Sequence, residues 1–411
     1  MNFIPVFTIL IVACFSKIVT KSWFSPGSFF SLMWFFFTLI PVVFAPGYEI
    51  NNSGLWYIAI FTMACSSGSV VAVIIAPSYS ISIAKHDNNQ YSNLAYSLFF
   101  FNAISVFGLI SLLFYLRSNY LSFESSISIF SLPNLVSVDR YSENLFYPAF
   151  IKYSLYFIYP SNIIAGILFI NSKTKKSLIN IFLPLLLSIL LGVIEGSRTS
   201  ILLGSILFIS SLISTRILKN DGKLSLSPIK IFICILFSIL IFIILFIFVQ
   251  WLRQDLNPII IDLILIRVKA YFFGYLSAFT LWFSDSGSLI SITSYLSTFA
   301  GPMNLIGIIE RDLGFYETIS INNYTSTNIY TAFRGLITDF SIVGSFLFNF
   351  CIGIFFQLQF QKERKFLYDG VLPLSIFYSF TLYSPLISIF HYNSIFFSWI
   401  VVFIVKKINF R

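Results

Sequence analysis

Two short segments of the sequence place arginine among hydroxyl and carboxylate side chains at the ends of long apolar runs. They are residues 195–200 (EGSRTS) and residues 328–344 (NIYTAFRGLITDFSIVG). A guanidinium group offers a planar fork of N–H donors that binds phosphate oxygens in bidentate fashion and stays charged when water is excluded. The two segments therefore predict anion-binding positions at Arg198 and Arg334.

Local features of both segments favour such a role. Gly196 allows a tight turn, and Ser197 or Thr199 can cap the helix that follows, so that Arg198 lies near backbone N–H groups that also attract an anion. Arg334 and Asp339 are five residues apart and are not good partners on one helix face, so each is expected to contact something else. The alternatives are that Arg198 is an interfacial arginine and that Asp339 is a charge near a helix N-terminus.

The composition indicates what kind of protein holds these segments. Of the 411 residues, 57% are hydrophobic and only 10% are charged, whereas a soluble domain carries about 25% charged residues. Runs of about 20 apolar residues, each long enough to cross a bilayer core of roughly 30 Å, recur along the chain. The sequence therefore excludes a separate soluble catalytic domain and predicts an all-α polytopic membrane protein, with residues 1–411 as a single integral membrane domain.

Eleven transmembrane helices are predicted from the apolar runs. They are 3–16, 28–45, 55–77, 94–116, 148–170, 177–194, 199–215, 230–250, 337–358, 371–390 and 393–405. Two further apolar stretches, 259–284 and 288–309, raise the count to thirteen if both span. The first contains Asp262, Arg267 and Lys269, which favours amphipathic helices lying at the interface over full burial in lipid.

The charges predict the orientation of these helices. Sorting them by predicted side gives sixteen bases and four acids on one side, and nine bases and twelve acids on the other. Short cytoplasmic loops retain Lys and Arg, so the first side is cytoplasmic and the N-terminus lies outside. The net charge of +9 is then an orientation signal, and no nucleic-acid partner is expected. Two long loops, 117–147 and 251–336, fall on the outer side.

The kind of base differs between the two sides. The outer side has seven arginines and two lysines, whereas the cytoplasmic side has three arginines and thirteen lysines. The orientation rule treats both residue types alike, so it does not account for this difference. An arginine-rich outer face suits a diphosphate on a membrane lipid, and the alternative is that these arginines pair with the outer acids. The four cysteines lack CxxC spacing, so neither a metal site nor a disulfide framework is indicated, and no cofactor is expected.

The motifs resemble those of a known family. The GSRT turn at 196–199, the long outer loop, the segment 328–344 and Gly353 beyond it are similar to the O-antigen polymerases, the Wzy-type oligosaccharide repeat-unit polymerases of bacterial envelopes. The specific match covers about 25 positions. Position 341 is Ser where that family often has Gly, and an odd number of spans departs from the even counts usual for it.

The resemblance implies a function and a location. Such enzymes are membrane glycosyltransferases of the inner (cytoplasmic) membrane that act at its periplasmic face. They transfer a growing glycan from undecaprenyl diphosphate to the non-reducing end of an incoming repeat unit, and so build O-antigen or a related surface polysaccharide. The expected partners are undecaprenyl-diphosphate-linked oligosaccharides, membrane lipid and a chain-length regulator protein.

The same resemblance assigns roles to the polar residues of the outer side. Arg198 and Arg334 are expected to stabilise the departing diphosphate. Glu195 or Asp339 is expected to deprotonate the acceptor hydroxyl. The residues expected to bind diphosphate or glycan are Arg253, Arg267, Arg311 and Tyr330. Tyr324, Tyr330 and Trp282 can stack on sugar rings, although interfacial aromatic belts are the alternative for all three.

Two other functions stay open. An O-antigen ligase shares the hydropathy and the lipid-diphosphate chemistry, but that family relies on a histidine in the large outer loop. Residues 251–336 contain no histidine, and His391 lies between the last two predicted spans. A lipid-linked oligosaccharide flippase, which is a transporter and not an enzyme, usually shows internal repeats and charged residues within its spans.

Overall fold

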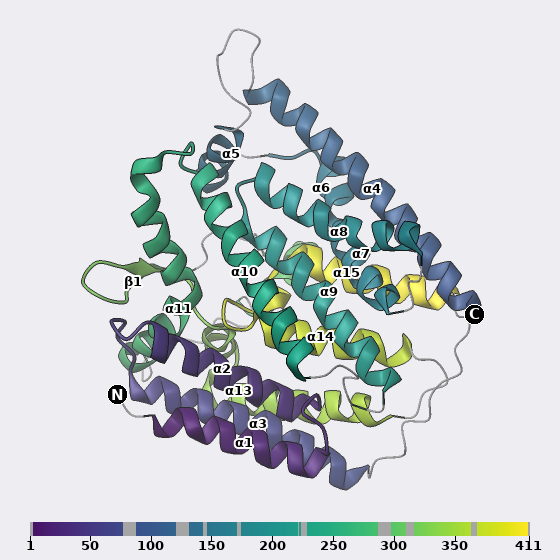
Figure 1. Ribbon diagram of the computed structural model, residues 1–411. Helices are drawn as coiled ribbons and strands as arrows, with labels where there is room; N and C mark the ends of the chain where they lie inside the picture. The colour runs from purple at the N-terminus through teal and green to yellow at the C-terminus, as the bar shows by residue number, and fades with distance from the viewer. Residues whose placement is uncertain are drawn as a thin grey trace. The chain divides into compact units, whose positions relative to one another are not determined.

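The computed structural model describes residues 3–76, 88–120, 131–142, 146–170, 174–220, 222, 228–286, 297–309, 316–362 and 368–409. Nearly all of these residues are helical (Figure 1). Six helical segments within them are long and apolar enough to cross a membrane. They are α2 (Pro26–Phe44), α3 (Asn52–Ile75), Tyr91–Tyr120 of α4 (Asn88–Tyr120), α8 (Lys175–Ile194), α9 (Arg198–Lys219) and α13 (Ala332–Gln361). The chain is therefore an all-α protein with the apolar helices of a multi-pass membrane protein, whereas the number of spans and their orientation stay predictions.

Every predicted span coincides with helix, but two of the predicted spans are interrupted. The remaining helices are α1 (Ile4–Thr20), α5 (Leu132–Tyr141), α6 (Ala149–Tyr156), α7 (Ile158–Phe169), α10 (Pro228–Leu252), α11 (Ile261–Ser286), α12 (Ala300–Leu305), α14 (Tyr368–Tyr383) and α15 (Asn393–Asn409), with short 3-10 turns η2 (Pro258–Ile260) and η3 (Ile389–His391). The span 148–170 is divided into α6 and α7, because Pro160 has no N–H for the carbonyl four residues earlier and its ring crowds that turn. The span 371–390 stops as α14 at Tyr383, just before Pro385, since the residue before a proline is disfavoured in helical conformation.

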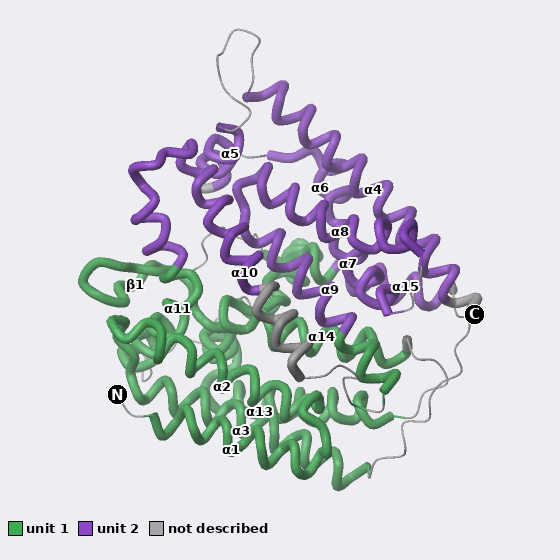
Figure 2. Tube along the Cα trace, in the orientation of Figure 1, with its two compact units in different colours: residues 1–86, 213–224, 269–396 green, residues 87–212, 225–268, 397–411 purple. Residues whose placement is uncertain are grey.

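By their internal contacts, the residues form two compact units (Figure 2). Unit 1 comprises residues 1–86, 213–224 and 269–396, and unit 2 comprises residues 87–212, 225–268 and 397–411. The single membrane domain expected from the sequence stays a prediction.

Unit 1 is built on the close approach of α3 and α13. An added Cβ at Gly68 would lie 2.1 Å from the Phe350 carbonyl oxygen, and one at Gly353 would lie 2.1 Å from the Cys65 carbonyl oxygen. The helices therefore touch backbone to backbone at this level, as small residues permit in membrane proteins. α1 and α2 pack on α3, and α14 packs on α13 and α2.

An aromatic core fills the space beside this contact. The Phe61 and Phe333 ring centroids lie 4.3 Å apart, and Trp34 stacks on Phe333 at the same centroid distance. Both Phe333 and Phe61 are fully buried. Because Phe333 precedes Arg334 in the first turn of α13, this packing fixes where that turn begins.

Unit 2 is organised around α4, which packs on α6, α7 and α8. Its apolar core combines side chains of α4, α6 and α8 with Val136 of α5. α5 lies within the predicted outer loop 117–147 and packs on α4, α8 and α10. The predicted loop therefore carries a docked helix, while residues 121–130 and 143–145 lie outside the described residues.

The segment predicted as the large outer loop contains several elements. A helix is present over most of the predicted amphipathic stretch 259–284, namely α11, and it is not among the six helices apolar enough to span. Of the stretch 288–309, residues 288–296 lie outside the described residues, and 297–309 contain only the six-residue helix α12. The sequence did not predict the antiparallel hairpin of β1 (Ile319–Ser320) and β2 (Ser326–Thr327).

The helix α13 is kinked at Ser341, whose φ of 66° and ψ of 174° lie in a region that is essentially restricted to glycine. Holding a serine there costs about 1–3 kcal/mol. We expect Ser341→Gly to raise the melting temperature of the purified protein and Ser341→Val to lower it, since a β-branched side chain is more strained at positive φ. A melting temperature that rises with valine would contradict this account of the kink.

Candidate functional site

The best-defined polar cluster of unit 1 surrounds Arg334 in the first turn of α13. Arg334 is only 7% exposed. Its Cζ atom lies 4.1 Å from the Tyr330 ring centroid, 4.3 Å from that of Tyr316 and 5.0 Å from that of Trp282. Each cation–π contact of this kind contributes roughly 0.5–2 kcal/mol, the larger values applying where water is excluded. We call Arg334 and these three rings the Arg334 cage.

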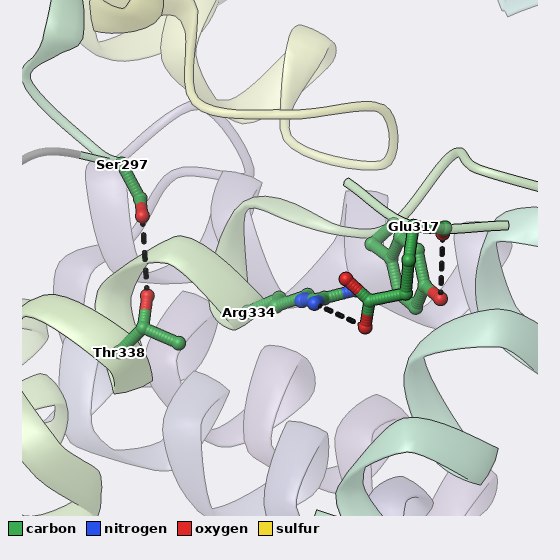
Figure 3. Close-up of polar contacts among 5 residues, drawn as sticks. Ser297, Glu317, Arg334 and Thr338 are labelled. Atoms are coloured by element: carbon green, nitrogen blue, oxygen red, sulfur yellow. Dashed lines mark hydrogen bonds and ion pairs between the residues drawn. The ribbon is translucent and has the colours of Figure 1, made fainter. Parts of the chain in front are cut away.

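Glu317 supplies a carboxylate to this cage (Figure 3). The Arg334 Nη2 atom donates to Glu317 Oε1 at 2.6 Å, and the side chain of Glu317 is 66% exposed. The Tyr330 hydroxyl donates to the backbone oxygen of Glu317 at 3.2 Å. The ion pair therefore joins a buried cation to an acid that mostly faces outward.

The pKa values of the cage follow from burial and from the guanidinium. Partial burial acts to raise the pKa of Glu317, but hydrogen bonds from its own backbone and from Arg334 outweigh it and leave that pKa lowered. Glu317 therefore stays charged until the pH falls through this lowered value. Burial raises the pKa of Tyr316 and of Tyr330, so both phenols stay neutral beside the cation.

Two guanidinium nitrogens of Arg334 have no hydrogen-bond partner among the described residues. They are Nε and Nη1, and both are buried. A buried donor left without a partner costs about 1–3 kcal/mol, and more when the group is charged. Arg334 therefore retains hydrogen-bonding capacity that the described residues do not use.

Asp339 has a different environment on the same helix. It is 2% exposed, and its two oxygens accept the backbone N–H groups of Ser297 at 3.2 Å and of Thr298 at 2.6 Å. The neighbouring Thr338 hydroxyl donates to Ser297 Oγ at 3.3 Å (Figure 3). The expectation that Arg334 and Asp339 contact separate groups is confirmed, and Asp339 fastens the segment 297–298 to α13.

His391 reaches the same segment from η3. Its Nδ1 atom lies 3.1 Å from the carbonyl oxygen of Ser297, and the side chain is 4% exposed. A carbonyl oxygen only accepts, so Nδ1 is the donor in this contact. Nothing in the sequence pattern indicates this contact, because the two residues are 94 positions apart.

In unit 2, α8 and α9 are joined by a turn at Gly196, as predicted. Gly196 has a φ of 58°, and α9 begins at Arg198. Glu195 forms an ion pair with Arg140 of α5, with Nη2 and Oε2 3.0 Å apart. Arg198 lies over the Phe246 ring, with its Cζ atom 5.7 Å from the centroid. Burial, and after it the charge of Glu195, raises the pKa of Tyr147 beside this pair.

Arg253 follows α10 and lines a cavity of about 440 Å³ in the same unit. The other lining residues are Asn134, Ser137, Val138, Ser142 and Gln254. Arg253 is a predicted binding residue, whereas the residues of α5 are not, because their helix falls in a loop that has no transmembrane hydropathy signal.

The predicted site residues therefore fall into two groups. Unit 1 holds Arg334, Asp339 and Tyr330, and unit 2 holds Glu195, Arg198, Arg253 and Arg267. Arg267 is exposed on α11, and Arg311 lies outside the described residues. Within the described part of the chain, no group of three or more His, Cys, Asp or Glu side chains is arranged to hold a metal ion.

Comparisons with known proteins do not name a relative of this chain. No protein-family model, curated protein or solved structure matches it.

Proposed function

We propose that the chain is a membrane glycosyltransferase that polymerises lipid-diphosphate-linked oligosaccharide repeat units. It transfers the growing glycan from undecaprenyl diphosphate to the non-reducing end of an incoming unit at the periplasmic face of the bacterial inner membrane. The product is O-antigen or a related surface polysaccharide, and a chain-length regulator protein is a further partner. The resemblance of residues 196–199 and 328–344 to O-antigen polymerases and the apolar helices support this proposal.

One observation carries the proposal, namely the buried guanidinium of Arg334 with two donors that lack a partner among the described residues. A cation held between aromatic rings is poorly hydrated, and its attraction for an oxyanion is therefore stronger than in water. The Glu317 carboxylate on Nη2 stands where one oxygen of a substrate anion would bind. Because that side chain is 66% exposed, an incoming diphosphate can displace it without unfolding the cage.

The reaction needs few groups from the protein. An acceptor hydroxyl attacks the anomeric carbon of the donor sugar, the new glycosidic bond forms, and the bond from that carbon to the diphosphate oxygen breaks. The electron pair of the broken bond leaves with undecaprenyl diphosphate, and the hydroxyl proton passes to a base. In the proposal Arg334 stabilises the charge that develops on the leaving oxygen, a role in which removing one donor typically costs about 10²–10³ in rate.

The two candidate bases have different surroundings. Both oxygens of Asp339 accept backbone N–H groups, so protonating it would weaken the contact to residues 297–298. We therefore assign Asp339 a positioning role for α13. Glu195 belongs to unit 2, where its side chain is 14% exposed and paired with Arg140, and the proposal gives it no role at Arg334.

A second function is favoured by one observation. An O-antigen ligase is expected to use a histidine in the large outer loop, and His391 contacts the Ser297 carbonyl within residues 251–336. A ligase would transfer a finished glycan to a different acceptor with the same diphosphate leaving group.

Deleting the gene separates these functions by the glycan that remains. Loss of a polymerase is expected to leave single repeat units attached at the cell surface, because units are still exported and joined to their final acceptor. Long chains that accumulate on the lipid and never become attached would instead identify a ligase. Loss of even single-unit glycan would point to a flippase. Gel electrophoresis of surface and lipid-linked glycan distinguishes the three results.

A further inference from the structure

Unit 2 contains a polar cavity that the reaction described above does not use. α5 supplies Asn134, Ser137 and Val138, Ser142 directly follows that helix, and the turn after α10 supplies Arg253 and Gln254. Its volume of about 440 Å³ lies within the range of about 300–1,000 Å³ that is typical of small-molecule sites.

The walls of the cavity are held together by specific contacts. The Asn134 side-chain amide donates to Asp255 Oδ2 at 2.7 Å and so joins α5 to the turn that carries Arg253. The Trp251 indole N–H donates to the Asn257 carbonyl at 3.2 Å and closes the same turn. The two walls are therefore fixed to each other by side chains from both.

The turn itself has an unusual backbone. Asp255 and Leu256 have φ values of 50° and 58°, a left-handed conformation that a bulky residue such as leucine rarely adopts. Consecutive residues of this kind are retained where surrounding contacts impose them, and such strain concentrates at binding and catalytic sites. Here the conformation places Arg253 and Gln254 along the cavity wall.

The GSR turn packs behind the same walls. An added Cβ at Gly196, which has a φ of 58°, would lie 2.7 Å from the Pro133 carbonyl oxygen and 3.1 Å from Arg253 Cγ. The turn that resembles the family motif therefore supports both α5 and Arg253. A substitution at Gly196 is expected to displace the cavity walls.

The lining has the chemistry of a saccharide site. The Ser137 hydroxyl donates to the Asn134 carbonyl at 2.8 Å, and the Ser142 hydroxyl donates to the Asp139 carbonyl at 3.2 Å. Both serine oxygens are therefore oriented as acceptors, while the amides of Asn134 and Gln254 both donate and accept, as sugar hydroxyls require. Val138 is the single apolar residue of the lining.

Other ligands fit this lining less well. A polyprenyl tail needs predominantly apolar walls, whereas Val138 is the one apolar residue among those that line this cavity. A diphosphate needs several cations or clustered N–H donors, whereas the residues that line this cavity include one guanidinium. We propose that the cavity binds the sugar portion of a lipid-linked glycan, with Arg253 donating to its oxygens, and this inference rests on the proposed function.

A binding measurement on the full-length purified protein tests this proposal. The probe is the repeat-unit oligosaccharide of the source strain, released from its lipid by mild acid and freed of phosphate, and inorganic pyrophosphate is the second probe. Val138 is 58% exposed, so Val138→Trp places a ring at the cavity without disturbing a core. Ile259 is 88% exposed and does not line the cavity, so Ile259→Trp is the matched control.

Wild type and Ile259→Trp are expected to bind the oligosaccharide. Arg253→Ala is expected to bind it at least about tenfold more weakly, because a hydrogen bond from a charged donor is lost. Val138→Trp is expected to weaken binding as well, because the larger side chain occupies part of the cavity. Equal affinity in all four proteins would overturn the proposal. So would pyrophosphate that binds in place of the sugar and is lost in Arg253→Ala, since the cavity would then be an anion site.

The binding measurement and the deletion strain test the saccharide site and the polymerase proposal separately. If the deletion strain loses polymer but the cavity variants bind sugar normally, the saccharide assignment is wrong and the polymerase proposal stands. If the cavity variants lose sugar binding but the deletion strain makes normal polymer, the saccharide site stands and the polymerase proposal is wrong.

Discussion

Arg334→Ala is expected to collapse the surface polysaccharide from a ladder of chain lengths to a single repeat unit, with the protein still present in the membrane. The substitution removes the donors that would stabilise the leaving diphosphate, and a loss of about 10²–10³ in rate is typical for such a donor. Arg334→Lys is expected to restore little, because an ammonium group lacks the planar fork and stacks poorly between the three rings of the cage. Gel electrophoresis of surface glycan, with an immunoblot of the membrane fraction, provides the measurement.

Glu317→Ala is the matched control for this prediction. If Arg334 served only to pair with Glu317 (2.6 Å), removing either partner would have the same effect. The proposed role instead predicts that Glu317→Ala keeps long chains, since Glu317 occupies the position of a substrate oxygen. Equal losses in the two variants, or a normal ladder in Arg334→Ala, would exclude Arg334 as the anion-binding group.

Adding a methyl group at Gly68 or Gly353 is expected to destabilise the protein strongly. In each case the new Cβ would lie 2.1 Å from a carbonyl oxygen of the facing helix, so α3 and α13 must move apart. Overpacking typically costs about 1–3 kcal/mol, and sometimes more. Neither obstacle is a flexible side chain that can move aside. We therefore expect Gly68→Ala and Gly353→Ala each to destabilise the protein by at least about 3 kcal/mol and to lower its melting temperature in detergent.

Gly47→Ala is the control, since nothing lies within 4 Å of an added Cβ at that position. It should melt like wild type. If Gly68→Ala and Gly353→Ala melted at the same temperature as Gly47→Ala, the backbone contact between α3 and α13 would not be present. A loosened α13 is also expected to shorten the polysaccharide, because that helix carries Arg334.

The sequence predicted the helices well because hydropathy records the length of apolar runs. It placed their ends less well, since Pro160 and Pro385 interrupt runs whose composition stays apolar on both sides. The hairpin of β1 and β2 is too short for any periodicity to indicate it. Its turn does have a local signal, because the Asn322 side chain accepts the N–H groups of Tyr324 and Thr325, an arrangement that asparagine favours.

The sequence indicated which residue types belong to the candidate sites, but not which residues they contact. Arg334, Arg253 and the turn at Gly196 could be selected because arginine and glycine have specific chemical and conformational uses. Their partners come from distant parts of the chain, such as Trp282 for Arg334 and Asn134 for the turn that carries Arg253. Contacts of this kind depend on tertiary packing, and a single sequence does not show which distant residues come together in the fold.

The excess of arginine on the predicted outer side now has more than one explanation. Arg140 pairs with Glu195, as the alternative of ion pairing with the outer acids predicts. Arg334 also has an acid beside it, but its partner is exposed and two of its nitrogens are left without hydrogen bonds among the described residues. Of these two environments, the one around Arg334 points to a ligand and the one around Arg140 does not. The burial of Arg334 is therefore more informative than the number of arginines on the predicted outer side.

The central claim is that the chain joins lipid-diphosphate-linked repeat units, and a reconstituted reaction tests it most directly. The purified protein in proteoliposomes is supplied with undecaprenyl-diphosphate-linked repeat units and no nucleotide sugar, and the glycan lengths and the released lipid diphosphate are measured together. The account predicts a ladder of chain lengths, with one undecaprenyl diphosphate released for each new glycosidic bond. Repeat units that stay single on their lipid, with no diphosphate released, would contradict it.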